Sequence, residues 1–171
     1  MTSYTAANRL LKELNAHQRK IRLGCSHDSQ LVILQPQSDQ DLFHWNATIY
    51  GRSNTPYAGG QFELEILVPK DYPTDPPRIR FITTICHPNI HIKTGEICLD
   101  LLNKAWSPAW TLESTCMAIL DLLSNPEADS PLNCDAANLI RSGDHRGYNS
   151  LVQMYTALHA CISDSQCSRQ Q

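Results

Sequence analysis

The chain has 171 residues, 42% of them apolar and 18% charged, which is enough apolar material for one buried core and excludes general disorder. A net charge of −3 argues against a nucleic-acid-binding protein that works through bulk positive charge. No apolar run approaches the roughly 18 residues of a membrane-spanning helix, and the N-terminus lacks the apolar stretch of a signal peptide. We therefore expect one domain over residues 1–171 in a reducing compartment, with no direct membrane insertion and with seven scattered cysteines as free thiols.

The first predicted element is a helix over residues 3–22, with Ser3 as its N-cap. The outer face of this helix is basic, because residues 8–22 hold five Lys or Arg and one Glu. This stretch has a net charge of +4, and the rest of the chain has a net charge of −7. Such a face is either solvated or docks an acidic partner. The apolar side chains near one face of this helix are Ala6, Ala7, Leu10, Leu11, Leu14 and Ile21.

Four strands are predicted next, over residues 31–34, 43–50, 61–68 and 78–82. The connections between them are too short for helical crossovers, so the sheet should be an antiparallel meander. Alternation predicts that one face of it is buried. The residues of that face are Phe43, Trp45, Ala47, Ile49, Phe62, Leu64, Ile66, Val68, Ile79 and Phe81.

A long irregular stretch, residues 83–111, follows the sheet, and a stretch of this length in a compact domain is usually functional. Three helices are predicted after it, over residues 112–123, 134–142 and 144–162, and then a frayed polar tail from about residue 163. This order of elements predicts an α+β domain.

Several short motifs occur in a fixed order along the chain. Together they resemble a ubiquitin-conjugating enzyme over about residues 4–160, although a lone His-Pro-Asn would be a weak signal. The resemblance implies the fold of that family, with an N-terminal helix, a four-stranded antiparallel meander, a long active-site loop and C-terminal helices. The motifs are Pro56-Tyr57-Ala58-Gly59-Gly60, Asp71-Tyr72-Pro73 with Pro76-Pro77, His87-Pro88-Asn89, Gly95-Glu96-Ile97-Cys98-Leu99-Asp100 and Trp106-Ser107-Pro108.

The resemblance implies acyl transfer through a thioester on Cys98, which takes the C-terminal glycine of ubiquitin from an activating enzyme and passes it to an acceptor. ATP is used by the activating enzyme, so no cofactor and no metal are expected here. Asn89 is implied to stabilise the oxyanion; the alternative, that it only ties the loop to its own backbone, stays open. His87, with Pro88, is implied to be a structural part of the active-site loop.

On the acceptor side, alignment from Cys98 and Trp106 puts Ser130 where many relatives carry an acid that orients or deprotonates a lysine. Asp129, just before it, either contributes to this acceptor gate or only caps the turn. Thr74 stands where many relatives carry a bulky apolar residue that docks ubiquitin ligases, so an altered ligase surface is expected. The surface assigned to the activating enzyme and the ligase consists of Arg9, Lys12, Thr74, Pro108 and Ala109.

The segment between Asn89 and Cys98 holds eight residues, one more than is usual. This length and the run over residues 137–144 resemble the peroxisomal ubiquitin-conjugating enzymes of yeasts. That branch implies transfer to peroxisomal import receptors, with a RING-type ligase and a membrane-anchored peroxisomal partner, at the cytosolic face of the peroxisomal membrane. The alternative within the family is a general cytosolic ubiquitin-conjugating enzyme.

Three other interpretations of the sequence remain as alternatives. A cysteine hydrolase built on Cys98, His87 and Asn89 would need a base positioned on the thiol. A metal site from Cys86, His87, His91 and Cys98 has suitable ligand types, but its spacing fits no common zinc pattern. A non-catalytic binding module of the same fold typically lacks the cysteine.

Overall fold

The structure is a computed structural model, and it describes residues 2–24, 31–98 and 106–161. The predicted polar tail and the Leu99-Asp100 end of the cysteine motif lie outside the described residues. The elements are α1 (Thr2–Leu23), β1 (Val32–Ser38), β2 (Asp41–Tyr50), β3 (Gln61–Leu67), β4 (Arg78–Phe81), α3 (Leu112–Ser124), α4 (Cys134–Arg141) and α5 (His145–His159).

The four strands form one sheet in the order β1-β2-β3-β4, with every neighbouring pair antiparallel, so the predicted meander is confirmed. The predicted alternation also holds, because Trp45, Ala47, Phe62, Leu64 and Ile66 are all buried. β1 runs four residues beyond its predicted end, through Pro36. Proline is tolerated there because β1 is an edge strand.

α1 differs from its prediction at its start and along its buried face. It begins at Thr2, so Ser3 lies inside the first turn and is not the N-cap. Leu11 and Ile21 are 42% and 47% exposed, whereas the polar His17 is 2% exposed. His17 fits there because its Nε2 accepts a hydrogen bond from the main-chain N–H of Leu34 at 3.1 Å.

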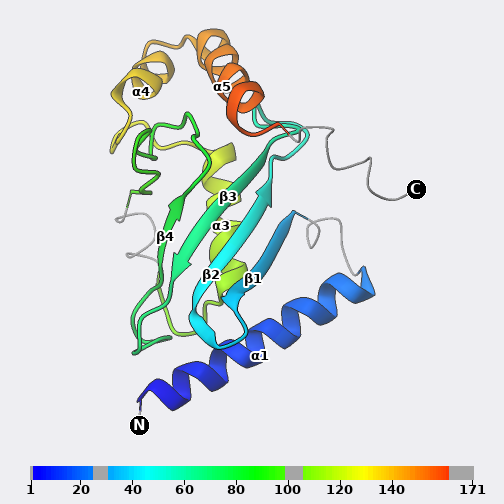
Figure 1. Ribbon diagram of the computed structural model, residues 1–171. Helices are drawn as coiled ribbons and strands as arrows, with labels where there is room; N and C mark the ends of the chain where they lie inside the picture. The colour runs from blue at the N-terminus through cyan, green and yellow to red at the C-terminus, as the bar shows by residue number, and fades with distance from the viewer. Residues whose placement is uncertain (1, 25–30, 99–105, 162–171) are drawn as a thin grey trace, which may run out of the picture.

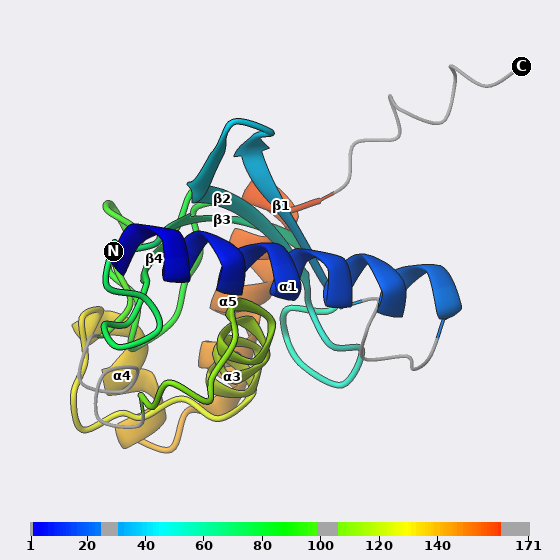
Figure 2. The ribbon, with the colours of Figure 1, turned by 90° about the horizontal axis from the view of Figure 1, so that it is seen from below.

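The helices are not spread evenly around the sheet (Figure 1). α3 packs against β1 and β2, and α1 contacts the same two strands and α3. Figure 2 shows α1 crossing the molecule at one end of the strands, while α4 and α5 lie at the opposite end in Figure 1. None of the helices that the structure describes is both long and apolar enough to cross a membrane.

Candidate active site

The segment that carries Cys98, residues 89–98, folds back on itself as an antiparallel ribbon. Ile90 and Ile97 pair antiparallel, and the N–H of Cys98 donates to the carbonyl of Asn89 at 2.9 Å. The turn closes where the N–H of Gly95 donates to the carbonyl of His91 at 2.8 Å. The extra residue in this segment is therefore accommodated in an ordered turn.

The ribbon is held against the edge of the sheet. The N–H of Phe81 in β4 donates to the carbonyl of Gly95 at 2.9 Å, and the main chains of Arg80 and Glu96 pair antiparallel. Gly95 has a φ of +72°, and a Cβ at this position would lie 1.9 Å from the carbonyl oxygen of Phe81. Only glycine allows this approach, so Gly95 fixes where the ribbon and Cys98 lie relative to β4.

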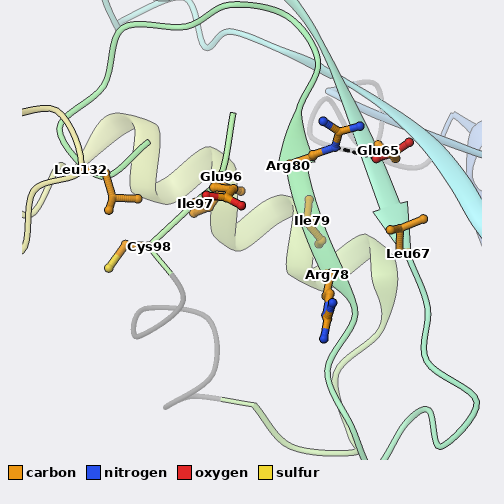
Figure 3. Close-up of a pocket in the computed structure, with 9 residues that line it drawn as sticks. All are labelled: Glu65, Leu67, Arg78, Ile79, Arg80, Glu96, Ile97, Cys98 and Leu132. Carbon is orange, nitrogen blue, oxygen red and sulfur yellow. Dashed lines mark hydrogen bonds and ion pairs between the residues drawn. The ribbon is translucent and has the colours of Figure 1, made fainter. Parts of the chain in front are cut away.

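Cys98 is partly exposed and lines a groove of about 510 Å³. The other lining residues shown in Figure 3 are Glu65, Leu67, Arg78, Ile79, Arg80, Glu96, Ile97 and Leu132. By contrast, burial raises the pKa of Cys86 to about 11 and that of Cys116 to about 12. Of the five cysteines that the structure describes, all free thiols, only Cys98 combines exposure with a place in this groove.

His87 and Pro88 anchor the loop that precedes the ribbon. The His87 side chain is fully buried; its Nδ1 accepts from the N–H of Asn89 at 3.0 Å, and its Nε2 lies 3.0 Å from the carbonyl of Leu122 in α3. Burial lowers the pKa of His87 to about 4, so the ring is neutral near pH 7 and its Nε2–H donates to Leu122. The carbonyl of Pro88 accepts from the N–H groups of Leu132 and Asn133, at 2.8 and 2.9 Å, just before α4.

Asn89 joins this loop to the segment before α4. Its Nδ2 donates to the carbonyls of Glu127 at 2.6 Å and Ser130 at 3.2 Å, and its Oδ1 accepts from the N–H of Glu127 at 2.9 Å. The side chain is fully buried, and both of its amide hydrogens are engaged. The structure thus ties the Asn89 side chain to the backbone of residues 127–130, the predicted acceptor-gate segment, and not to its own loop.

The side chains of Asp129 and Ser130 are exposed within this acceptor-gate segment. The segment is held on its other side by Arg141 at the end of α4, whose Nη2 donates to the carbonyl of Ala128. Leu132, two residues after Ser130, lines the groove of Cys98. The structure therefore brings the gate segment to the border of that groove.

Arg9, predicted as part of the partner surface, makes contacts within the fold. Its Nε donates to Glu13 at 2.6 Å and its Nη2 to the carbonyl of Trp110 at 2.9 Å. The Glu13 carboxylate also accepts from the hydroxyl of Tyr72 at 2.8 Å and from the N–H of Leu112 at 2.9 Å. The sequence analysis missed Glu13, although a single acid in a basic stretch was a visible signal.

Three of the other predicted surface residues share one end of the molecule. Thr74, Pro108 and Ala109 are exposed, as is Lys12 on α1. The two loops involved are linked because Nε1 of Trp106 donates to the carbonyl of Pro73 at 3.0 Å. The Glu13 contacts place α1 against the same loops.

The geometry argues against a cysteine hydrolase at this site. Both ring nitrogens of His87 are engaged by main-chain groups, so His87 cannot serve as the base of a cysteine hydrolase. Within residues 2–24, 31–98 and 106–161, no cluster of three His, Cys, Asp or Glu side chains is arranged to hold a metal ion.

Comparison with known proteins agrees with the fold and identifies the family. The family model described as ubiquitin-conjugating enzyme matches residues 9–156. Peroxin-4 of Arabidopsis thaliana is 55% identical over 89% of this chain and 93% of its own length, and the ubiquitin-conjugating enzyme E2 pex4 of Dictyostelium discoideum is 53% identical over 91% and 99%. The crystal structure of H. polymorpha Pex4p, in complex with the soluble domain of Pex22p, matches with a TM-score of 0.83 and 38% identity over 92% of this chain and 99% of Pex4p. The chain therefore belongs to the ubiquitin-conjugating enzymes, transferases that work through a thioester, and within that family to the peroxin-4 type.

Proposed function

We propose that Cys98 is the residue that carries ubiquitin. In loading, the thiolate of Cys98 attacks the carbonyl carbon of the thioester between ubiquitin and the activating enzyme. A new C–S bond forms, the old one breaks, and the thiolate of the activating enzyme leaves. The observation that carries this assignment is the place of Cys98 at the end of the ribbon, partly exposed in the groove, while Cys86 and Cys116 are buried with raised pKa values.

In transfer, the nucleophilic atom of the acceptor attacks the same carbonyl carbon and negative charge develops on its oxygen. The bond to Cys98 then breaks, its thiolate leaves, and the acceptor gives up its proton. We assign Asn89 to this step. For Nδ2 to donate a hydrogen bond directly to the oxyanion, it must release one of the two carbonyls that it now binds. The hydrogen bond to the Ser130 carbonyl is the longer of the two, so it is the one that the oxyanion replaces. Asn89 also positions the gate segment through Glu127.

Asp129 and Ser130 form the acceptor gate in this proposal. Both side chains are exposed on a segment that borders the groove of Cys98. Ser130 leaves the gate without an acid at the position where many relatives have one, and Asp129 supplies a carboxylate one residue earlier. Such a gate is suited to orienting an acceptor more than to deprotonating it.

A ubiquitin-conjugating enzyme requires ubiquitin, an activating enzyme and a ligase as partners. We assign the shared end of α1 and the two linked loops to the activating enzyme and to a RING-type ligase. Support comes from the exposure of Lys12, Thr74, Pro108 and Ala109 at that end. Arg9 contributes by holding α1 to these loops.

We further propose that the enzyme modifies peroxisomal import receptors at the cytosolic face of the peroxisomal membrane. Relatives named peroxin-4 and pex4 support a peroxisomal role. The H. polymorpha enzyme was crystallised with the soluble domain of Pex22p, which supports recruitment by a membrane-anchored protein of that kind. Pull-down from peroxisomal membranes with the Cys98→Ser protein tests this: recovery of an integral membrane protein by this chain, and not by a general ubiquitin-conjugating enzyme, is the expected result.

The carrier assignment is tested by incubation with activating enzyme, ATP and ubiquitin. The wild type should form an adduct of one ubiquitin mass that thiol reductant removes. Cys98→Ser should form an adduct that resists reductant, because an oxyester replaces the thioester, and Cys98→Ala should form none. A reductant-sensitive adduct on Cys98→Ala would refute the assignment, and Cys134→Ala, which removes an exposed thiol outside the groove, serves as the matched control.

A further inference from the structure

The groove beside Cys98 lies where two neighbouring segments separate. β4 and the ribbon pair at Arg80 and Glu96. In a continued antiparallel register, the residues two positions further along on each side, Arg78 and Cys98, would face each other next. Instead the groove separates them, with Cys98 and Leu132 on one side and Arg78 and Leu67 on the other (Figure 3).

The walls of the groove have an apolar strip. Leu67 pairs with Arg78, so the two side chains stand on the same face of the sheet. Leu67 is 37% exposed and Leu132 is 40% exposed, on opposite sides of the groove, with Ile97 between them. Apolar side chains on both sides of a groove that holds a reactive thiol can bury an apolar residue of a bound segment.

The charged side chains that line the groove are two Arg and two Glu, so their net charge is zero, but they do not form two ion pairs. The Nε of Arg80 lies 2.6 Å from Oε2 of Glu65, and Glu65 and, more weakly, Glu96 raise the pKa of Arg80. Arg78 is exposed, and its side chain forms no ion pair or hydrogen bond with another described residue. Within the part of the chain that the structure describes, the side of the groove opposite Cys98 thus presents the Arg78 guanidinium to an anionic group.

The main chain of β4 indicates the conformation of the occupant. The N–H of Phe81 donates to Gly95 in the ribbon. Because peptide groups alternate in direction along a strand, the N–H of Ile79 points to the same side as that of Phe81, toward the gap that opens beyond the Arg80–Glu96 pairing. An open strand edge of this kind binds an extended peptide.

We propose that this groove binds the acceptor segment of the modified protein as an extended peptide, with an acidic side chain of that segment paired to Arg78. The acceptor side chain then lies at Cys98, and an apolar neighbour packs between Leu67 and Leu132. This proposal rests on the proposed function, since it assigns the substrate preference of the same site. It predicts that acidic residues near the acceptor favour transfer.

The test compares two synthetic peptides as acceptors for the loaded enzyme. They differ only at the positions two residues before and two residues after a single acceptor lysine, which hold Glu in one peptide and Gln in the other. These positions share the face of the lysine in an extended chain. Wild type should discharge about two- to five-fold faster to the Glu peptide, which lies within the range of an exposed ion pair. Arg78→Gln should abolish the difference, and Arg78→Glu should reverse it.

The ratio between the two peptides cancels any change in loading or in general transfer rate. Lys93→Glu is the matched control, because Lys93 is an exposed cation of the ribbon turn outside the groove. Equal rates for both peptides in wild type, or an unchanged ratio in Arg78→Glu, would overturn the proposal, and so would an equal change in Lys93→Glu, which would indicate a general field effect. Absence of any ubiquitin adduct in wild type would instead overturn the proposed function itself.

Discussion

Asn89 binds the main chain of Glu127 in two ways: its Nδ2 donates to the Glu127 carbonyl at 2.6 Å and its Oδ1 accepts from the Glu127 N–H at 2.9 Å. Only a side-chain amide offers a donor and an acceptor in this arrangement. The loop of Asn89 and the acceptor-gate segment are therefore joined through one buried side chain. A substitution here changes both the stability of the site and its geometry.

We expect Asn89→Ala to load ubiquitin but to discharge it slowly, by a factor on the order of 10² or more, because the oxyanion loses a donor and the gate loses its support. Unfolding by denaturant should also show a loss of about 2–4 kcal/mol, since three buried hydrogen bonds are removed. Single-turnover discharge to free lysine measures the first effect.

Arg141→Ala serves as the control for Asn89→Ala, because it releases the same gate segment at Ala128 without touching the loop of Asn89. If Asn89 acts only by position, the two variants should slow discharge to a similar extent. A much larger effect of Asn89→Ala supports a direct role. Discharge of Asn89→Ala at the wild-type rate, with an intact fold, would exclude both roles.

The basic face of α1 is tested best at Lys12, which is exposed, and not at Arg9, which is engaged with Glu13 and Trp110. Lys12→Glu should slow loading by the activating enzyme several-fold at about 50 mM salt and much less at about 500 mM, where exposed charges are screened. Its Tm should stay unchanged. Equal loading rates at both salt concentrations would show that this face is only solvated.

Arg9→Glu is the matched comparison for Lys12→Glu, with the same change of charge one helical turn away. It places a second carboxylate beside Glu13 and removes the bond to the Trp110 carbonyl. We expect it to lower the Tm by several degrees, which thermal unfolding measures. A Tm equal to that of wild type would contradict the structural role of Arg9.

The gate should affect the choice between cysteine and lysine acceptors. A thiol has an unperturbed pKa of about 8.5, roughly two units below that of lysine, and needs less help to lose its proton. An acid at the gate also repels an approaching thiolate. We therefore expect Ser130→Asp to shift discharge toward lysine, measured as the ratio of rates to free cysteine and free lysine at matched pH.

For Ser130→Asp, Ser130→Asn is the control, because it adds similar bulk without charge. An unchanged ratio, or a shift toward cysteine, would show that Ser130 is ordinary variation. Asp129 stays in place in both variants, so it does not affect the comparison.

The buried His87 predicts how stability depends on pH. Its pKa is about 4 in the folded state against about 6.5 when unfolded, so the unfolded state binds more protons between these values. The stabilisation is complete above about pH 6.5 and is lost as the pH falls toward 4. Denaturant unfolding should show a loss of about 2 kcal/mol between pH 7 and pH 5.

His17 contributes with the same sign, because burial lowers its pKa too. In His87→Gln, the loss of stability between pH 7 and pH 5 should be clearly smaller than in wild type, whatever its absolute stability. An equal loss in this variant would place the pH dependence in other groups.

Much of the fold followed from the sequence, because alternation and short connections are local properties. The alternation of Trp45, Ala47 and Ile49 predicted the buried face of β2, and the short connections predicted the meander. The motif order predicted the ubiquitin-conjugating fold, and the peroxin-4 type followed from the length of the ribbon and the run over residues 137–144. A periodic pattern or a motif spacing is visible in the sequence itself, whichever distant residues the segment contacts in the fold.

The tertiary structure alone decided which polar residues are engaged and which are free. Arg9 and Lys12 look alike in the sequence, yet Arg9 is bound to a carbonyl 101 residues away, and Lys12 is exposed. Arg78 and Arg80 also look alike, but Glu65 neutralises only Arg80. Hydrogen bonds and ion pairs act over a few ångströms, so their partners are set by how distant segments pack, and no local pattern contains that information.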